Sequence, residues 1–409
     1  GPELLGTLSE TSAARVPYLI NGNLENIAGK TWYQVWHAWV EKAQIEAQRD
    51  LARIRSHAVS KQVPITTAGV HGYAHAISPN GRWLAFTHDS SDFRSGLYLR
   101  DLTDPPDAQS NLRLLDKQGG VGLGFTEDSQ WVIFSGLRRA SNYELLSDLG
   151  AVNIETGKTA WILAGQRAKD PHVGTTPLLG GQSIVYVQAE GVRNHLVLAP
   201  LSQDEFGTPT LGSDRKILFT APDYDRISGP KISPDGKYVA YAHQRNDRLG
   251  EDLELLDLGT GSAKTVVGDG FRNRYPAFHR SGNLAFVSDR TGVDNVYLMD
   301  TGLRTRLLTQ VTTGVWFPTF DRDGNLYGSH FSTRGWDVVR FQQLEISVDP
   351  ALVSINEQLP TPSAVASVLP PSSAPSPSPL PSPVTFESTP YSVWPSLLPS
   401  ICYPTTFFE

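Results

Sequence analysis

The stretch ISPDGKYVAY, residues 232–241, places a Ser-Pro-Asp-Gly turn between an apolar residue and an alternating apolar run. Proline fixes one φ angle, aspartate or asparagine tolerates a tight bend, and glycine supplies a positive φ, so two strands can reverse direction within a few residues. The stretch therefore predicts a tight β-hairpin in which the aspartate builds the turn.

The same pattern recurs along the chain. The other copies are ISPNGRWLAF at 77–86, FTEDSQWVIF at 125–134, FHRSGNLAFV at 278–287, FDRDGNLYGS at 320–329 and a degenerate LLGGQSIVYV at 178–187. Further strand-like runs follow the copies, such as DLELLDL at 252–258. Six copies with a period near that of a four-stranded blade predict an all-β, six-bladed β-propeller.

One of these copies, together with a second stretch further along the chain, resembles a known family. ISPDGKYVAY followed by SDRTGVDNVYLMD at 288–300 is similar to the repeat of the TolB family of six-bladed propellers, and the resemblance covers about residues 65–345. In the second stretch, Asp289 and Arg290 are expected to orient the turn at Gly292 and to bridge neighbouring strands.

The resemblance also implies how the ring closes. Members of the family usually let one terminal strand complete the blade formed by the other end of the chain. We expect VPITT at 63–67 to pair with the last blade, around 335–343, because an unpaired strand edge invites aggregation.

The two flanks differ from the repeats. Residues 31–57 predict a helix capped by Thr31 and Gln34, and its apolar face around Trp36 and Trp39 is expected to pack on the neighbouring domain. After residue 348 the chain is dominated by proline and serine. We expect a helical segment at 1–62, the propeller at 63–347, and a Pro/Ser-rich linker with an aromatic end at 348–409.

A weaker resemblance concerns the flanks. NGNLENIAGKTWYQVWHAWVEKAQ at 21–44 resembles the helical tail of a zinc metallopeptidase domain that precedes a TolB-like propeller in some bacterial envelope proteins. YSVWPSLLP at 391–399 resembles the run-in to the outer-membrane β-barrel that follows such a propeller. The resemblance implies a periplasmic or outer-membrane-associated location, with a peptidase domain or a barrel as neighbours.

Composition excludes some classes of function. The net charge is -7, and no run of lysine and arginine provides a field for nucleic acid. No apolar run is long enough to span a bilayer. The opening Gly1-Pro2 indicates a cleaved tag, so the chain is expected to be a fragment of a longer protein.

Motifs for catalysis are missing from the sequence. It contains neither a G-x-S-x-G elbow nor an H-E-x-x-H zinc motif. His71 and His75 are four residues apart, but ahead of a β repeat this spacing does not form the two-histidine face that it would form on a helix. We expect no catalytic residue, no metal site and no cofactor in this chain.

The mouth of the channel is the expected ligand site, because the residues just before each inner strand ring it. Alignment on the prolines of RNRYPAF at 272–278 and GVWFPTF at 314–320 selects Tyr73, Val121, Thr175, Ser228, Arg274 and Trp316, with Ala74, Tyr275 and Phe317 beside them. Arg226 and Arg272 are expected to add positive charge, which favours an extended peptide with a carboxylate. The predicted ligand-binding residues are Tyr73, Arg226, Arg274, Tyr275 and Trp316.

Several functions fit these observations. The first is a non-catalytic protein- or peptide-binding propeller module of a larger bacterial envelope protein. The alternatives are a regulatory gate for an adjacent metallopeptidase domain and a hydrolase that uses a calcium ion in the channel. The aromatic residues at the mouth would, in another interpretation, only plug the channel or stack between blades.

Overall fold

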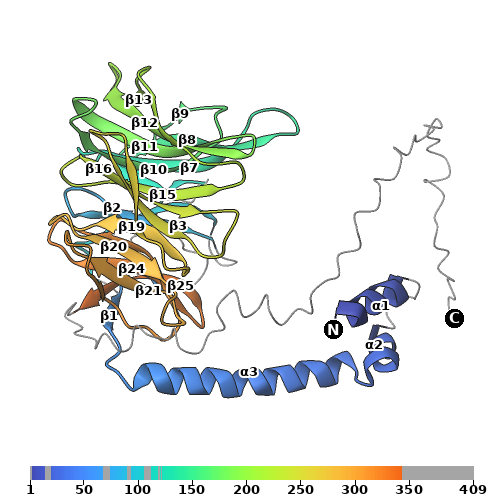
Figure 1. Ribbon diagram of the computed structural model, residues 1–409. Helices are drawn as coiled ribbons and strands as arrows, with labels where there is room; N and C mark the ends of the chain where they lie inside the picture. Colours follow the sequence, from blue (N-terminus) through green and yellow to red (C-terminus); the bar gives the residue numbers. More distant parts are fainter. Residues whose placement is uncertain are drawn as a thin grey trace, which may run out of the picture. The chain divides into compact units, whose positions relative to one another are not determined.

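The structure is a computed structural model, and it describes residues 2–13, 20–67, 74–89, 94–105, 112–117, 120 and 122–342. The predicted Pro/Ser-rich segment at 348–409 lies outside the described residues. Three helices come first: α1 (Pro2–Ala13), α2 (Ile20–Ala28) and α3 (Trp32–Arg55). Strands β1 to β25 follow, and in Figure 1 they form a stack of twisted antiparallel sheets.

Each sheet is one blade, built from strands that are consecutive in the sequence except in the last blade. Blade 1 contains β2 (His75–Ile77), β3 (Trp83–His88), β4 (Gly96–Asp101) and β5 (Arg113–Asp116). Blade 2 contains β6 (Leu123–Phe125), β7 (Trp131–Arg139), β8 (Leu145–Asn153) and β9 (Thr159–Leu163). Blade 3 contains β10 (Ala168–Thr176), β11 (Gly181–Glu190), β12 (Arg193–Gln203), β13 (Pro209–Leu211) and β14 (Lys216–Thr220).

The second half of the ring repeats the arrangement. Blade 4 contains β15 (Arg226–Ile232), β16 (Tyr238–Gln244), β17 (Asp252–Asp257) and β18 (Ala263–Val267). Blade 5 contains β19 (Asn273–Phe278), β20 (Leu284–Ser288), β21 (Asn295–Met299) and β22 (Thr305–Leu307). Blade 6 contains β23 (Val315–Phe320), β24 (Leu326–Ser332), β25 (Gly335–Gln342) and β1 (Lys61–Pro64).

The first strands of the blades form a closed ring. They contact one another in the order β2, β6, β10, β15, β19 and β23, and β23 contacts β2 again. The predicted all-β, six-bladed propeller with an N-terminal helix is confirmed.

The ring closes through the N-terminal strand, as predicted, although the strand begins two residues earlier than expected. Strand β1 pairs antiparallel with β25, from Lys61 opposite Gln342 to Pro64 opposite Val339, and Figure 1 shows it entering the last blade. The backbone N–H groups of Ile65 and Thr66 also donate to the carbonyl of Val338. No residue of β25 opposite β1 is therefore left with an open edge.

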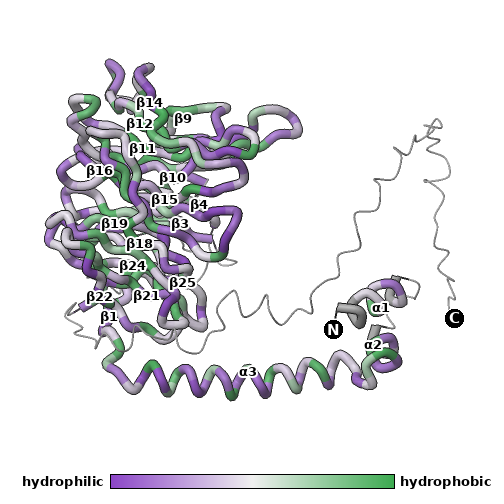
Figure 2. Tube along the Cα trace, viewed as in Figure 1, coloured by the Kyte–Doolittle hydropathy of each residue, from purple (hydrophilic) through white to green (hydrophobic). Residues whose placement is uncertain are grey.

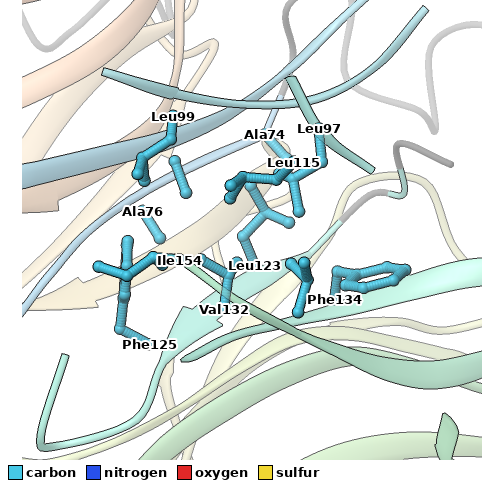
Figure 3. Packing of buried hydrophobic residues seen from close by; sticks show 12 residues of the cluster. Ala74, Ala76, Leu97, Leu99, Leu115, Leu123, Phe125, Val132, Phe134 and Ile154 are labelled. Atoms are coloured by element: carbon cyan, nitrogen blue, oxygen red, sulfur yellow. The ribbon is translucent and has the colours of Figure 1, made fainter. Parts of the chain in front are cut away.

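Apolar side chains between neighbouring blades form the core. Figure 2 shows hydrophobic residues along the strands of the blades and hydrophilic ones in many of the connecting loops. Between blades 1 and 2, for example, Leu97 and Leu99 face Val132 and Phe134, and all four are almost completely buried (Figure 3). Close packing of this kind joins sheets that share few backbone hydrogen bonds.

The repeated turn works as its sequence predicts. In the hairpin between β15 and β16, Asp235 accepts hydrogen bonds from the Ser233 hydroxyl at 2.6 Å and from the backbone N–H of Lys237 at 3.2 Å. Ser233 Oγ in turn accepts from the backbone N–H of Tyr238. Burial alone would raise the pKa of Asp235, but these hydrogen bonds hold it below its usual value. The aspartate is a structural anion.

Gly236 in this turn is expected to resist substitution. It has a φ of 71°, and a Cβ there would lie 2.3 Å from the carbonyl oxygen of Thr175 in the neighbouring blade. Gly261 has the same φ of 71° but nothing within 4 Å. Gly261→Ala should therefore cost about 1 kcal/mol of unfolding free energy, from backbone strain alone. Gly236→Ala should cost roughly 2 to 4 kcal/mol, because the blades must also shift.

Urea unfolding of both glycine variants measures this difference. Equal losses of stability would show that the blades adjust without cost at this contact.

The stretch that follows the fifth hairpin is also structural, as expected. Asp289 accepts a hydrogen bond from the backbone N–H of Arg272 and forms an ion pair with its guanidinium at 2.8 Å. Arg290 donates to the Asn273 side chain at 2.9 Å. Gly292 adopts a φ of 79° in the turn. These residues join β20 to β21 and to the start of the blade.

Helix α3 begins with the predicted capping box. The backbone N–H of Gln34 donates to Thr31 Oγ1 at 3.2 Å, and the backbone N–H of Thr31 donates to Gln34 Oε1 at 3.0 Å. The prediction that its aromatic face packs on the neighbouring domain is wrong for the described residues, because Trp36 is 59% and Trp39 is 58% exposed. Helical periodicity predicts which side chains share a face, but it does not specify what covers them.

Among the residues that the structure describes, the C-terminal end of α3 is the part of the helix that contacts the blades. Ile54 is buried, and its carbonyl accepts a hydrogen bond from Gln310 Nε2 at 2.9 Å. The backbone N–H of Gln310 donates to Ser60 Oγ at 2.8 Å. This connection fixes the chain just before β1 against the end of blade 5.

Candidate functional site

The candidate site is a cavity of about 660 Å³ between the inner strands. All six inner strands or the residues just before them contribute to its lining, as do the β7–β8 hairpin and the loop before β17. The cavity is therefore the central channel, and it lies at the end where the inner strands begin.

Four inner strands carry the same irregularity in this channel. Each has a register shift at a residue of positive φ that is followed by proline. These residues are Asp170 (φ 54°), Gly229 (φ 57°), Tyr275 (φ 53°) and Phe317 (φ 51°). All four line the cavity. A left-handed conformation costs a non-glycine residue roughly 1 to 2 kcal/mol, and such strain is typical of functional sites.

The backbone at these bulges turns toward the channel. The N–H of Gly229 donates to Asp170 Oδ2 of the neighbouring blade at 3.2 Å, instead of to a strand partner. Bulges of this kind re-aim groups next to binding sites.

The fold that surrounds this channel is established by the ring of sheets. The chain is a six-bladed β-propeller. No protein-family model matches it, and no curated protein matches it in sequence.

Solved structures similar to the propeller include two TolB structures. TolB from Acinetobacter baumannii is 15% identical over 65% of each chain, with a TM-score of 0.43. A putative TolB from Agrobacterium tumefaciens is 16% identical over 70% of this chain and 100% of that one, with a TM-score of 0.44.

The propeller of this chain is also similar to puromycin hydrolase. The identity is 19% over 71% of this chain and 48% of that one, with a TM-score of 0.45. This chain spans 65% of the length of the first TolB and about half of the hydrolase. At these identities the similarity concerns the fold alone.

The predicted site residues fall into three groups. Tyr73 and Val121 lie outside the described residues. Arg226, Ser228, Arg274 and Tyr275 line the cavity, together with Ala74 and Phe317. Trp316 and Arg272 are not among the described residues that line it.

The sequence alignment wrongly placed Thr175 at the mouth of the channel. It lies near the far end of β10, pairs with Gln182 and donates a side-chain hydrogen bond to Glu127. The residue equivalent to Arg274 is Lys169, because Lys169 pairs with Val187 as Arg274 pairs with Val287. Strands β10 and β11 have 9 and 10 residues, longer than their counterparts in blade 5, and this extra length shifts the register.

Arg274 is already paired. Its guanidinium donates to Asp294 Oδ2 at 2.9 Å and lies over the rings of Tyr275 and Trp316, at 5.2 and 4.8 Å from their centroids. Trp316 Nε1 donates to the same carboxylate oxygen at 2.6 Å. Arg272 is likewise held by Asp289. The positive charge expected from Arg274 and Arg272 is therefore largely compensated within the propeller.

The aromatic residues stack between blades. Tyr275 and Phe317 lie in adjacent inner strands with ring centroids 4.1 Å apart. This contact is what the plug interpretation expects, but both rings still face open cavity. Burial raises the pKa of Tyr275, so its hydroxyl stays protonated at neutral pH.

Sequence reasoning missed four charged residues of the cavity: Lys169, Asp170, Lys231 and Glu251. Asp170 precedes a proline and Lys231 follows one. The dipeptides Asp170-Pro171 and Gly229-Pro230 have the same pattern as Tyr275-Pro276 and Phe317-Pro318. This repeat of a residue followed by proline is the signal that would have found them. Glu251 reaches the site from the loop before β17, which the repeat does not mark.

The electrostatics of the cavity are dominated by unpaired cations. Lys169, Arg226 and Lys231 form no side-chain hydrogen bond or ion pair with any residue in the described ranges, whereas burial raises the pKa of both Asp170 and Glu251. In a chain with net charge -7, this cavity is positive. Within the described part of the chain, no group of three or more His, Cys, Asp or Glu residues is placed to hold a metal ion.

Proposed function

We propose that this chain is a protein- or peptide-binding propeller module of a larger bacterial envelope protein, located in the periplasm or at the outer membrane. In this proposal the mouth of the central channel binds an extended segment that carries acidic groups. No helix among the described residues is long and apolar enough to cross a membrane.

One observation carries the proposal. The channel cavity combines three unpaired cations with the half-buried rings of Tyr275 and Phe317, which line it. Carboxylates bind guanidinium and ammonium groups by charge-assisted hydrogen bonds, and aromatic faces accept the intervening chain. A volume of about 660 Å³ holds a few residues of such a segment.

The aromatic face of α3 favours the alternative function, a gate for an adjacent metallopeptidase domain. Trp36 and Trp39 are more than half exposed on this face, at 59% and 58%, and a neighbouring domain would cover them. The two functions use different surfaces, because α3 contributes no residue to the channel cavity.

Substitution of Arg226 tests the first function. Arg226 is exposed at the start of β15 and has no partner in the described chain, so Arg226→Ala should leave the fold intact. The affinity for N-acetylated pentaglutamate, measured by calorimetry, should fall about tenfold. Arg306→Ala, on the exposed outer strand β22, is the matched control and should not change the affinity.

Two results would count against the channel as the ligand site. One is an equal effect of both arginine substitutions, which would indicate a diffuse charge effect. The other is binding that Arg226→Ala leaves unchanged.

A further inference from the structure

Lys231 lies deeper in the channel than any cation that the sequence indicated. It is the sixth residue of β15, whose first residue is Arg226, and both line the same cavity. At about 3.3 Å per residue, their Cα atoms are separated by roughly 15 Å along the channel wall. The strand therefore presents one cation at the mouth and another inside.

The ammonium group of Lys231 has no partner of its own. It makes no hydrogen bond or ion pair with any residue that the structure describes, and Asp170, the acid whose charge acts on it, accepts from the backbone N–H of Gly229. Burial lowers the pKa of Lys231 to about 8, against an opposing effect of Asp170. The group is still mainly protonated at neutral pH, so a charge is held in a poorly solvated place with only the through-space attraction of Asp170 to offset it.

Other residues that line the cavity fit an anion better than a second cation. His75 also lines the cavity, and burial followed by the charge of Lys231 lowers its pKa to about 3, so it is neutral. Thr319 lines the cavity from β23, and its hydroxyl has no hydrogen-bond partner among the described residues. An ammonium and a free hydroxyl can both donate hydrogen bonds to a carboxylate.

We propose that Lys231 binds a carboxylate of the ligand inside the channel, with the Thr319 hydroxyl as a second donor. This inference rests on the proposed function, because the ligand passes Arg226 at the mouth before it reaches Lys231. The carboxylate is either the free C-terminus of a peptide or the side chain of an Asp or Glu residue.

Protection of Lys231 from a small amine-modifying reagent provides the test. The labelling rate of each lysine is measured by mass spectrometry at neutral pH, with and without a saturating peptide. N-acetylated pentaglutamate should slow the labelling of Lys231 about tenfold or more. Lys237, exposed in the turn at the end of the same hairpin, should be labelled at an unchanged rate.

Two further peptides separate the sources of the carboxylate. Pentaglutamate with a C-terminal amide carries only side-chain carboxylates, and N-acetylated pentaglutamine carries only the terminal one. The peptide that protects Lys231 identifies the source. If none of the three protects Lys231, the inference is overturned.

Lys231→Met separates this inference from the proposed function. The variant should bind the protecting peptide about tenfold more weakly, whereas Lys237→Met should bind it normally. Its urea midpoint should stay the same or rise, because an unpaired cation is replaced by an apolar group of similar length. A marked fall in the midpoint would show that Lys231 supports the fold instead.

The combined outcomes are distinct. If Arg226→Ala weakens binding and Lys231→Met does not, the peptide-binding function stands and the deeper carboxylate site is wrong. If neither substitution weakens binding, both proposals fail.

Discussion

Deletion of residues 1–67 should lower the free energy of unfolding by on the order of 5 kcal/mol and make the purified chain aggregate. The deletion removes β1, so the edge of β25 from Val339 to Gln342 loses its partner. It also removes Ile65, which packs with Leu84 and Val338 between blades 1 and 6. Unpaired edges pair with other chains, so light scattering should rise together with the loss of stability.

A shorter deletion is the matched control. Deletion of residues 1–51 removes most of the helical segment but keeps Ile54, Ser60 and β1. The free energy of unfolding should stay within about 1 kcal/mol of the intact chain, because the removed side chains contribute little to the propeller core. Equal losses for the two deletions would show that the helices, and not β1, close the ring.

Glu254→Gln should destabilise the propeller by about 3 to 5 kcal/mol. Glu254 is buried in blade 4 and accepts hydrogen bonds from the Tyr241 hydroxyl at 2.7 Å, from His243 Nδ1 at 2.9 Å and from Arg245 at 2.6 Å. On its other side His243 Nε2 donates to Asp225 at 3.0 Å. A glutamine offers one oxygen to three donors and turns its own N–H groups toward a cation, so donors stay unpaired.

The stability that Glu254→Gln removes should depend on pH within a defined range. Burial alone would raise the pKa of Glu254, but the bonds from His243 and Tyr241 hold it below its ordinary 4.5. Burial alone would lower the pKa of His243, but Glu254 and Asp225 raise it above its ordinary 6.5. A lowered carboxylate pKa adds stability that disappears as the pH falls, and a raised imidazole pKa adds stability that disappears as the pH rises through its folded value.

Urea unfolding at two pH values measures this dependence. The difference between the intact chain and Glu254→Gln should be largest at about pH 5.5, between the two ordinary pKa values, and smaller at about pH 8.5. Glu205→Gln, at an exposed site in the loop before β13, should show no difference at either pH. A constant difference across this range would mean that His243 does not change its protonation state in the folded protein between these two pH values.

Much of the fold could be predicted because its signals are local. Each copy of the turn carries its own donors and acceptors within five residues, as Ser233 and Asp235 show. The capping box of α3 is equally local. The regular recurrence of such hairpins then predicted six blades, and the need to pair an open edge predicted the pairing of β1 with β25.

The candidate site was predicted only in part because it depends on register. Ser228 and Arg274 line the channel as aligned, but Thr175 does not, because a longer hairpin in blade 3 moves Lys169 into its place. Arg274 faces the channel with its charge already paired to Asp294. The free positive charge in the channel therefore comes from other residues than those that the sequence alignment selected.

The sequence by itself determined the turns, the number of blades and the capped helix, since each depends on residues a few positions apart. Tertiary structure alone decided which side chains meet in the channel and which remain unpaired there, as with Lys231, and it left the aromatic face of α3 exposed. The reason is physical: the depth of a side chain in the channel is set by hairpin length and by bulges in neighbouring blades, whose combined effect no short stretch encodes.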